Sequence, residues 1–303
     1  MRKTTKRVLY SLLLLCILII IICSLKYTSF MEGFTRTVRT KGLILYSIGG
    51  LGNQLFIYAT GLFFKKTFNV DVFLINHAST TTHSDRDYRF LMRGITPLEE
   101  TDPIFKHARE FNFSENYPYY NYNENEIPVD DTSYIKIGIY DFQVYKKIRG
   151  AINEVRESVV SKCKELYNNL SIHSESSAFI HVRRGDYLTD VDGKRMISPE
   201  FYKKALEILN ESDNIDVIYI FSDDILWCRE QIWNTPKKLV YYDDPDELKT
   251  LYMMSQCWAG AVISNSTFSL WGALLGAYEK TNTIVYPTNE YFLKDLPDSW
   301  IKI

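Results

Sequence analysis

The stretch GLILYSIGGLGNQLFIYATGLFFKKTFNVDVFLI, residues 42–75, contains a strand–helix–strand pattern. The apolar run at 42–48 is typical of a buried strand, residues 54–68 indicate a helix, and residues 69–75 form a second apolar run. Two strands that are joined through a helix run parallel, and a parallel sheet needs helices on both of its faces. This stretch therefore predicts an α/β fold.

The same alternation continues toward the C-terminus, whereas residues 76–131 show no period and are expected to be irregular. We expect further strands at 134–140, 178–182, 216–221, 239–243, 259–264 and 283–287, and helices at 149–166, 199–209, 225–233, 247–257 and 266–279. Alternation over this length predicts two Rossmann-like lobes whose parallel sheets face each other across a cleft. Ligands are expected there, at the carboxyl ends of the strands.

The N-terminal segment differs from the rest. Residues 8–25 (VLYSLLLLCILIIIICSL) carry no charge and follow the basic residues Arg2, Lys3, Lys6 and Arg7. An uncharged run of this length can span a bilayer, and preceding basic residues indicate a cytosolic N-terminus. A cleaved signal peptide is the alternative, but it normally has a shorter apolar run and a small-residue cleavage site. We expect a transmembrane signal-anchor.

The domain boundaries follow from these patterns. We expect a cytosolic tail at 1–7, the anchor at 8–25, a stem at 26–41, an N-terminal lobe at 42–165 and a C-terminal lobe at 166–303, whose last residues could pack back on the N-terminal lobe. The net charge of the chain is −2 and no basic stripe is present, which argues against a nucleic-acid partner. The absence of any Cys-x-x-Cys pair argues against a zinc site. The sequence leaves the oligomeric state open.

The motif HVRRGDY, residues 181–187, directly follows a predicted strand. Adjacent side chains on an extended backbone point in different directions. One arginine could bind a phosphate with its planar fork while the other pairs with Asp186. The alternative is a surface turn with a local salt bridge.

Two further motifs also follow predicted strands. In FSDDILWC (221–228), a carboxylate could accept two hydrogen bonds from one edge of guanine, but Ser222, Asp223 and Asp224 could also simply cap a helix. In SNSTFSLWGALLG (264–276), the helix N-terminus offers free N–H groups and hydroxyls that suit an anion. The alternative there is an ordinary Ser/Thr cap.

The glycine-rich loop of the opening stretch lacks the third glycine of a dinucleotide fingerprint and has no Gly-Lys-Ser/Thr. A dehydrogenase or an ATPase is therefore disfavoured. Asp190-Val191-Asp192 has the D-x-D spacing of metal-dependent sugar transferases, but it lies in a polar turn ending at Gly193, which favours a loop. Spacing alone leaves a hydrolase carboxylate pair open.

Together, GGLGNQLFIYATG, HVRRGDY, FSDDILWC and NSTFSLWGALLG, in this order over residues 42–303, resemble the α-1,2-fucosyltransferases of glycosyltransferase family 11. The resemblance implies a GT-B fold, GDP-fucose as donor, inversion at the sugar carbon, no metal and no other cofactor. It implies transfer to the 2-hydroxyl of a galactose-terminated glycan by a type II membrane protein of the Golgi apparatus. The C-terminal lobe would bind GDP-fucose, and the N-terminal lobe would face the acceptor.

The resemblance also implies site residues. Arg184 first and Arg183 second would hold the donor diphosphate and stabilise the leaving group. Donor contacts would come from His181, Arg183, Arg184, Asp186, Ser222, Asp223, Asp224, Ser266, Thr267 and Phe268, with Asp223 or Asp224 facing guanine. Gly50 and Gly52 would let the opposite loop close on the fucose, and Asn53 and Gln54 would contact fucose or acceptor.

The catalytic base is the least defined part of the site. A base would help to remove the acceptor proton, and Asp190 and Asp192 are the candidates that follow the arginine motif. One departure from the family is Leu270, where many members have tryptophan. Two rivals stay open: a catalytically inactive, membrane-anchored protein that binds glycan or nucleotide, and a metal-dependent sugar transferase of another class.

Overall fold

The structure is a computed structural model, and it describes residues 41–47, 49–76, 86–111, 125, 127–129, 134–137, 145–168, 170, 172, 174–189, 195–231, 233–276, 283–288 and 296–303. The predicted tail, anchor and most of the stem lie outside these residues, as do Asp190 and Asp192. Within the described part of the chain, no helix combines the length and the apolar character needed to cross a membrane.

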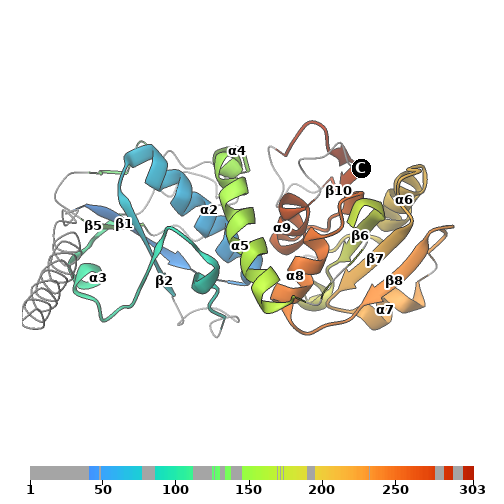
Figure 1. Ribbon diagram of the computed structural model, residues 1–303, viewed down its shortest axis with the longest axis horizontal. Coiled ribbons are helices and arrows are strands. Elements are labelled where there is room, and N and C mark those ends of the chain that lie inside the picture. Colours follow the sequence, from blue (N-terminus) through green and yellow to red (C-terminus); the bar gives the residue numbers. More distant parts are fainter. Residues whose placement is uncertain are drawn as a thin grey trace, which may run out of the picture. The chain divides into compact units, whose positions relative to one another are not determined.

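The N-terminal sheet has five strands in the order β3-β2-β1-β5-β4, and all neighbouring strands run parallel. Its strands are β1 (Gly42–Ser47), β2 (Asp71–Asn76), β3 (Thr96–Leu98), β4 (Arg109–Phe111) and β5 (Tyr134–Ile137). Helix α2 (Leu51–Phe68) connects β1 to β2, as the opening stretch predicts (Figure 1). The short elements α3 (Pro103–His107) and η1 (Arg89–Leu91) lie between β2 and β4 along the chain.

Alternating residues of β1 bury opposite faces of this sheet. Leu43 and Leu45 belong to the main core together with α2, whereas Ile44 and Tyr46 belong to a smaller cluster against which Phe105 of α3 packs. Side chains in a strand alternate in direction, so one apolar run covers both faces. The uninterrupted apolar sequence of β1 is therefore explained by burial on two sides.

The C-terminal sheet has six parallel strands in the order β11-β10-β9-β6-β7-β8. They are β6 (Ser177–Val182), β7 (Val217–Ser222), β8 (Lys238–Tyr242), β9 (Gly260–Val262), β10 (Thr283–Tyr286) and β11 (Ile301–Lys302). Its helices are α6 (Pro199–Asn210), α7 (Ile225–Glu230), α8 (Glu247–Ser255) and α9 (Thr267–Leu275), and two short turns are η4 (Ser174–Ser176) and η5 (Gly185–Thr189) (Figure 1). One face packs on α6 and α7, and the other on α8 and α9.

Helix α5 (Ile152–Leu166) follows α4 (Tyr145–Ile148) and η3 (Arg149–Ala151), and it joins the two sheets. Arg156 of α5 donates to the carbonyls of Leu274 at 2.8 Å and Leu275 at 3.0 Å, at the C-terminal end of α9. Phe56 of α2 packs edge-on against Trp271 of α9, with ring centroids 5.3 Å apart. These residues bury one continuous core, so α2, α5 and α9 hold the two sheets together.

The predicted α/β class with parallel sheets is confirmed, but one expectation is wrong. Residues 76–131 are not uniformly irregular, because β3, α3 and β4 occur there. Three-residue strands are too short to show a period. At the C-terminus, β11 pairs with β10 through Val285 and Ile301, and Trp300 belongs to the core cluster that includes residues of α2. The expectation that the last residues pack back on the N-terminal lobe stays a prediction.

Candidate functional site

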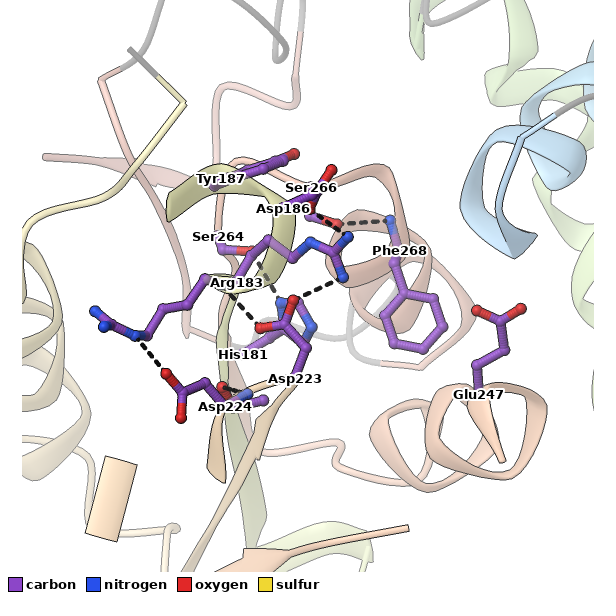
Figure 2. A network of polar contacts seen from close by, with 12 residues as sticks. His181, Arg183, Asp186, Tyr187, Asp223, Asp224, Glu247, Ser264, Ser266 and Phe268 are labelled. Carbon is purple, nitrogen blue, oxygen red and sulfur yellow. Dashed lines mark hydrogen bonds and ion pairs between the residues drawn. The ribbon is translucent and has the colours of Figure 1, made fainter. Parts of the chain in front are cut away.

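Three neighbouring strands of the C-terminal sheet end at one edge, and each leads into a polar motif. In the register of β6 and β7, Val182 lies opposite Ser222, and Ile180 of β6 lies opposite Val262 of β9. The arginine motif, the SDD motif and the NST motif follow these three strands. Parallel strands end at the same edge of their sheet, so the topology brings the three motifs together, as Figure 2 shows.

Arg183 is held by two carboxylates at this edge. Its guanidinium donates to Asp186 Oδ1 at 2.6 Å and pairs with Asp223 Oδ2 at 2.9 Å. The carbon of the guanidinium lies 5.5 Å from the centre of the Tyr187 ring. The side chain is still 30% exposed. Arg183 is thus a partly exposed cation whose position is fixed before any ligand binds (Figure 2).

Arg184 has different neighbours. Its Nε lies 2.9 Å from Asp224 Oδ2, and its guanidinium stacks on Trp227 with 4.0 Å between its carbon and the ring centre. Asp224 also caps α7 by accepting from the N–H of Trp227 at 3.2 Å. The hydrogen bond from Arg184 lowers the pKa of Asp224. The capping alternative therefore holds for Asp224, and Arg184 is bound to α7.

Asp223 is tied to the arginine motif as well. Its Oδ1 accepts a 2.8 Å hydrogen bond from the backbone N–H of Arg184. A Cβ atom at Gly185 would lie 2.4 Å from Asp223 Oδ2, so a larger residue there would require this carboxylate to move. Ser222 accepts from the N–H of Asp224 at 2.9 Å. The SDD motif thus serves first to fix the two arginines and the start of α7.

His181 is a buried, neutral side chain beneath the site. Its Nδ1 lies 2.8 Å from Ser264 Oγ, which in turn lies 3.2 Å from Ser269 Oγ. Its ring centre is 5.7 Å from that of Phe268. Burial, reinforced by the charge of Arg183, lowers the pKa of His181 to about 3. His181 is therefore an uncharged imidazole at neutral pH, and it supports the start of α9 through Ser264 and Phe268.

The N-terminus of α9 carries no acidic residue in its described first turn, and Ser266 caps it by accepting from Phe268 N at 3.3 Å. Asn265, the first residue of the NST motif, is fully buried, and neither polar atom of its side chain bonds to a described residue. A helix N-terminus without acidic residues attracts anions. Leu270, the departure from the family pattern, is 2% exposed and belongs to the core.

The glycine loop of the N-terminal lobe reaches this same helix. Gly49 has a φ of +74°, Gly50 precedes α2, and α2 begins at Leu51, earlier than predicted. A Cβ atom at Gly52 would lie only 2.5 Å from the backbone nitrogen of Phe268. Gly52 therefore lets the first turns of α2 and α9 touch. The expectation that Gly50 and Gly52 let this loop close on the fucose stays a prediction.

Asn53 and Gln54 differ in their surroundings. Asn53 Oδ1 accepts a 2.8 Å hydrogen bond from Thr267 Oγ1 of α9. Gln54 is 1% exposed, and its amide binds the carbonyls of Gly49 and Arg86 at 2.9 Å each. Its oxygen accepts from Ser47 Oγ at 3.1 Å. The side-chain amide of Gln54 thus holds the loop through both of its polar atoms, and its expected contact with fucose or acceptor stays a prediction.

A comparison with known protein families shows the family of this chain. The model of glycosyl transferase family 11 matches residues 18–302. This chain belongs to glycosyl transferase family 11. It is a glycosyltransferase, and its relatives include fucosyltransferases and a colitosyltransferase.

Three relatives of this family 11 chain differ in how much of the sequence they match. It is 24% identical over 299 residues to the O-antigen biosynthesis glycosyltransferase WbnK of Escherichia coli, which covers 84% of this chain and 98% of that protein. It is 29% identical over 144 residues to an alpha-1,2-colitosyltransferase of Escherichia coli, covering 44% and 49%. It is 30% identical over 115 residues to a galactoside 2-alpha-L-fucosyltransferase of Caenorhabditis elegans, covering 35% and 31%.

Among solved structures, the fucosyltransferase NodZ from Bradyrhizobium is similar at 12% identity and a TM-score of 0.47. The match covers 78% of this family 11 chain and 93% of that one.

One group of residues in this family 11 enzyme escaped the sequence analysis. Glu247 of α8 accepts from Arg86 Nη1 at 2.9 Å and from the hydroxyl of Tyr88. Tyr88 N also donates to Gln54 Oε1 at 3.2 Å, which ties this group to the glycine loop. Arg86 and Glu247 lie 161 residues apart, so no local sequence pattern predicts that they pair. The sequence indicates only that Asp246 caps α8, which makes Glu247 the first residue of that helix.

The carboxylates proposed as bases stay predictions. Asp190 and Asp192 fall outside the described residues, and the described ranges contain no group of three His, Cys, Asp or Glu side chains arranged to hold a metal ion.

Proposed function

We propose that this family 11 glycosyltransferase transfers fucose from GDP-fucose to the 2-hydroxyl of a galactose-type acceptor on a glycan, with inversion and without a metal ion. The observation that carries the proposal is Arg183, a partly exposed cation that Asp186 and Asp223 hold at the carboxyl edge of the C-terminal sheet (Figure 2). Tyr187, whose ring centre lies 5.5 Å from this guanidinium, donates to the carbonyl of Asn265 just before α9. A GT-B arrangement of two lobes, as the family resemblance implies, is part of the proposal.

The chemistry asks for positive charge at this edge. Breaking the bond between the sugar and GDP leaves negative charge on the β-phosphate. Prearranged donors that face this charge lower the barrier, and each is worth about 3–4 kcal/mol in known enzymes. Arg183 can supply such donors, and the first turn of α9, which contains no acidic residue, adds the positive end of the helix dipole.

Arg183 takes precedence over Arg184 in this proposal. Arg184 is 17% exposed, and its guanidinium pairs with Asp224 and stacks on Trp227. Its charge is therefore already compensated by the N-cap residue of α7. Arg183 is 30% exposed and is held by Asp186 and Asp223, so its guanidinium is the more accessible of the two at this edge of the sheet. Asp223 and Asp186 would then serve as the groups that keep the guanidinium in place.

The acceptor and the base complete the proposal. Displacement with inversion requires the acceptor oxygen to approach the sugar from the face opposite to the diphosphate, and a base assists the loss of its proton. Asp190 and Asp192 are proposed for this task because they follow the arginine motif in sequence. The relative in Caenorhabditis elegans, named as a galactoside 2-alpha-L-fucosyltransferase, supports a galactoside acceptor.

A donor panel tests the reaction. The purified protein is incubated with lactose and GDP-fucose, GDP-colitose or a UDP-sugar, each with and without EDTA. We expect fucosylated lactose from GDP-fucose, unaffected by EDTA. A preference for GDP-colitose would instead favour the activity named for the colitosyltransferase relative. Loss of transfer with EDTA, or a preference for a UDP-sugar, would refute the proposal, and binding without turnover would indicate an inactive binding protein.

We also propose that residues 8–25 anchor the protein in the Golgi membrane with its N-terminus in the cytosol. The basic cluster before the apolar run supports this orientation. In intact microsomes, protease should then remove an N-terminal tag while residues 42–303 stay protected. Release of the protein by alkaline carbonate would contradict the anchor.

A further inference from the structure

We propose that Arg86, Tyr88 and Phe90, together with Glu247, form a binding subsite for the acceptor glycan. The inference rests on the proposed function, because it names where the acceptor of that reaction binds. Sugars are bound by planar charged side chains, which make paired hydrogen bonds to hydroxyls, and by aromatic rings, which cover the apolar face of a pyranose. This segment offers both kinds of group.

The polar part of the subsite is the Arg86–Glu247 pair. The pair measures 2.9 Å, and the two side chains are 38% and 25% exposed. Only Nη1 of Arg86 is engaged, so the rest of its guanidinium has no partner within the described part of the chain. A guanidinium has five N–H donors in a fixed fork. The remaining donors, and the free lone pairs of Glu247, can bind neighbouring hydroxyls of a sugar.

The apolar part is Phe90. Its side chain is 55% exposed, the second most exposed large hydrophobic side chain among the described residues. Its ring lies 6.2 Å from the ring of Tyr88, whose hydroxyl binds Glu247. Burial, then the hydrogen bond to Glu247, raises the pKa of Tyr88, so this hydroxyl stays protonated. The exposed ring of Phe90 and the Glu247 carboxylate that binds Tyr88 thus bring an apolar and a polar group together around one segment.

The segment is rigid, which suits recognition. The guanidinium of Arg89 donates to the carbonyl of Leu98 at 2.7 Å and to Asp87 at 2.8–3.1 Å. These hydrogen bonds lower the pKa of Asp87. Gln54 adds a bond to the carbonyl of Arg86. Phe90 and Arg86 are therefore presented in fixed positions, so that little ordering free energy is lost on binding.

The position of the subsite matches the proposed donor site. A Cβ atom at Gly50 would lie 3.8 Å from Arg86 Nη1, so the guanidinium borders the start of α2. Two residues further along, Gly52 touches the start of α9, where the donor phosphates are proposed to bind. An acceptor held by Arg86 would therefore lie beside the glycine loop that borders the start of α9.

Kinetics of exposed-ring variants test this subsite. With GDP-fucose as donor and lactose as acceptor, Phe90→Ala should raise the KM for lactose about tenfold. The KM for GDP-fucose should change less than about twofold. Phe90→Trp keeps a ring and should keep the KM for lactose. Leu166→Ala, which removes another exposed apolar side chain (49% exposed) on α5, is the matched control and should change neither constant.

The outcomes separate the two proposals. If the wild type uses another donor, the proposed function fails and the lactose measurements are made with that donor. If no donor is used, saturation-transfer NMR of lactose against wild type and Phe90→Ala reads binding directly. An unchanged KM or NMR signal for lactose in Phe90→Ala would overturn the subsite. So would a Phe90→Ala variant that raises both KM values alike, because that result indicates a structural role only.

Discussion

The hydroxyl of Thr267 donates a 2.8 Å hydrogen bond to Oδ1 of Asn53, which lies 214 positions earlier in the chain. Thr267 opens α9 of the C-terminal lobe, and Asn53 lies in the first turn of α2 of the N-terminal lobe. Beside this bond, Gly52 lies against the backbone of Phe268. The loop that the sequence suggested as the facing wall of a cleft is thus in direct contact with the proposed phosphate site.

Asn53→Ala should lower kcat about tenfold while the affinity for GDP falls less than about threefold, because Thr267 loses the partner that orients its hydroxyl. Isothermal titration with GDP and initial-rate kinetics measure the two quantities. Thr267→Val and the double variant complete a cycle in which the coupling should be about 1 kcal/mol. Equal losses in GDP binding and turnover would instead place Asn53 in the nucleotide site.

Gly52→Ala should destabilise the protein by about 1–3 kcal/mol, because the new Cβ would lie 2.5 Å from Phe268 N and must displace backbone. Urea unfolding measures the change. Gly150→Ala is the matched control, since nothing lies within 4 Å of its added Cβ and its φ is not positive. The control should be neutral or slightly stabilising. If the two variants were equally stable, the contact between α2 and α9 would be looser than the structure shows.

The part of the fold that follows from sequence is the part with long apolar runs. GLILYS and AFIHV are buried on both faces, and their composition shows it. Strands of three residues, such as β3 and β4, are defined by the neighbour with which they pair and not by their own composition. They could not be predicted from a single sequence.

The candidate site shows the same limit. Motifs at strand ends were predictable because parallel strands share an edge. The hydrogen-bond and ion-pair partners of individual side chains could not be predicted in this way. Arg183 and Arg184 are neighbours in sequence, yet one pairs with Asp186 and Asp223 and the other with Asp224. Which arginine faces α9 depends on contacts that form only in the folded chain.

Arg183→Lys should reduce kcat/KM for GDP-fucose by about 100-fold, because lysine keeps the charge but loses the planar fork. Arg184→Lys should reduce kcat/KM by less than about tenfold. It should also lower the melting temperature, since Arg184 binds Asp224 and stacks on Trp227. Steady-state kinetics and thermal unfolding of both variants provide the comparison. The reverse ranking of kcat/KM would restore Arg184 as the principal phosphate ligand.

Acid should weaken the fold through His181. Burial lowers its pKa to about 3 in the folded chain, whereas an unfolded histidine has a pKa of about 6.5. Below about pH 6.5 the histidine is protonated in the unfolded chain but stays neutral in the folded chain. The free energy of unfolding therefore falls by up to about 1.4 kcal/mol for each pH unit below that value. Above about pH 6.5 the contribution of His181 to the free energy of unfolding is constant. Carboxylates such as Asp224, whose pKa is lowered, add their own acid dependence, so the measurement is the difference between wild type and His181→Gln in urea unfolding from pH 7 to pH 4. Glutamine cannot titrate and can still bond to Ser264. Parallel curves for the two proteins would show that His181 is protonated in the folded state.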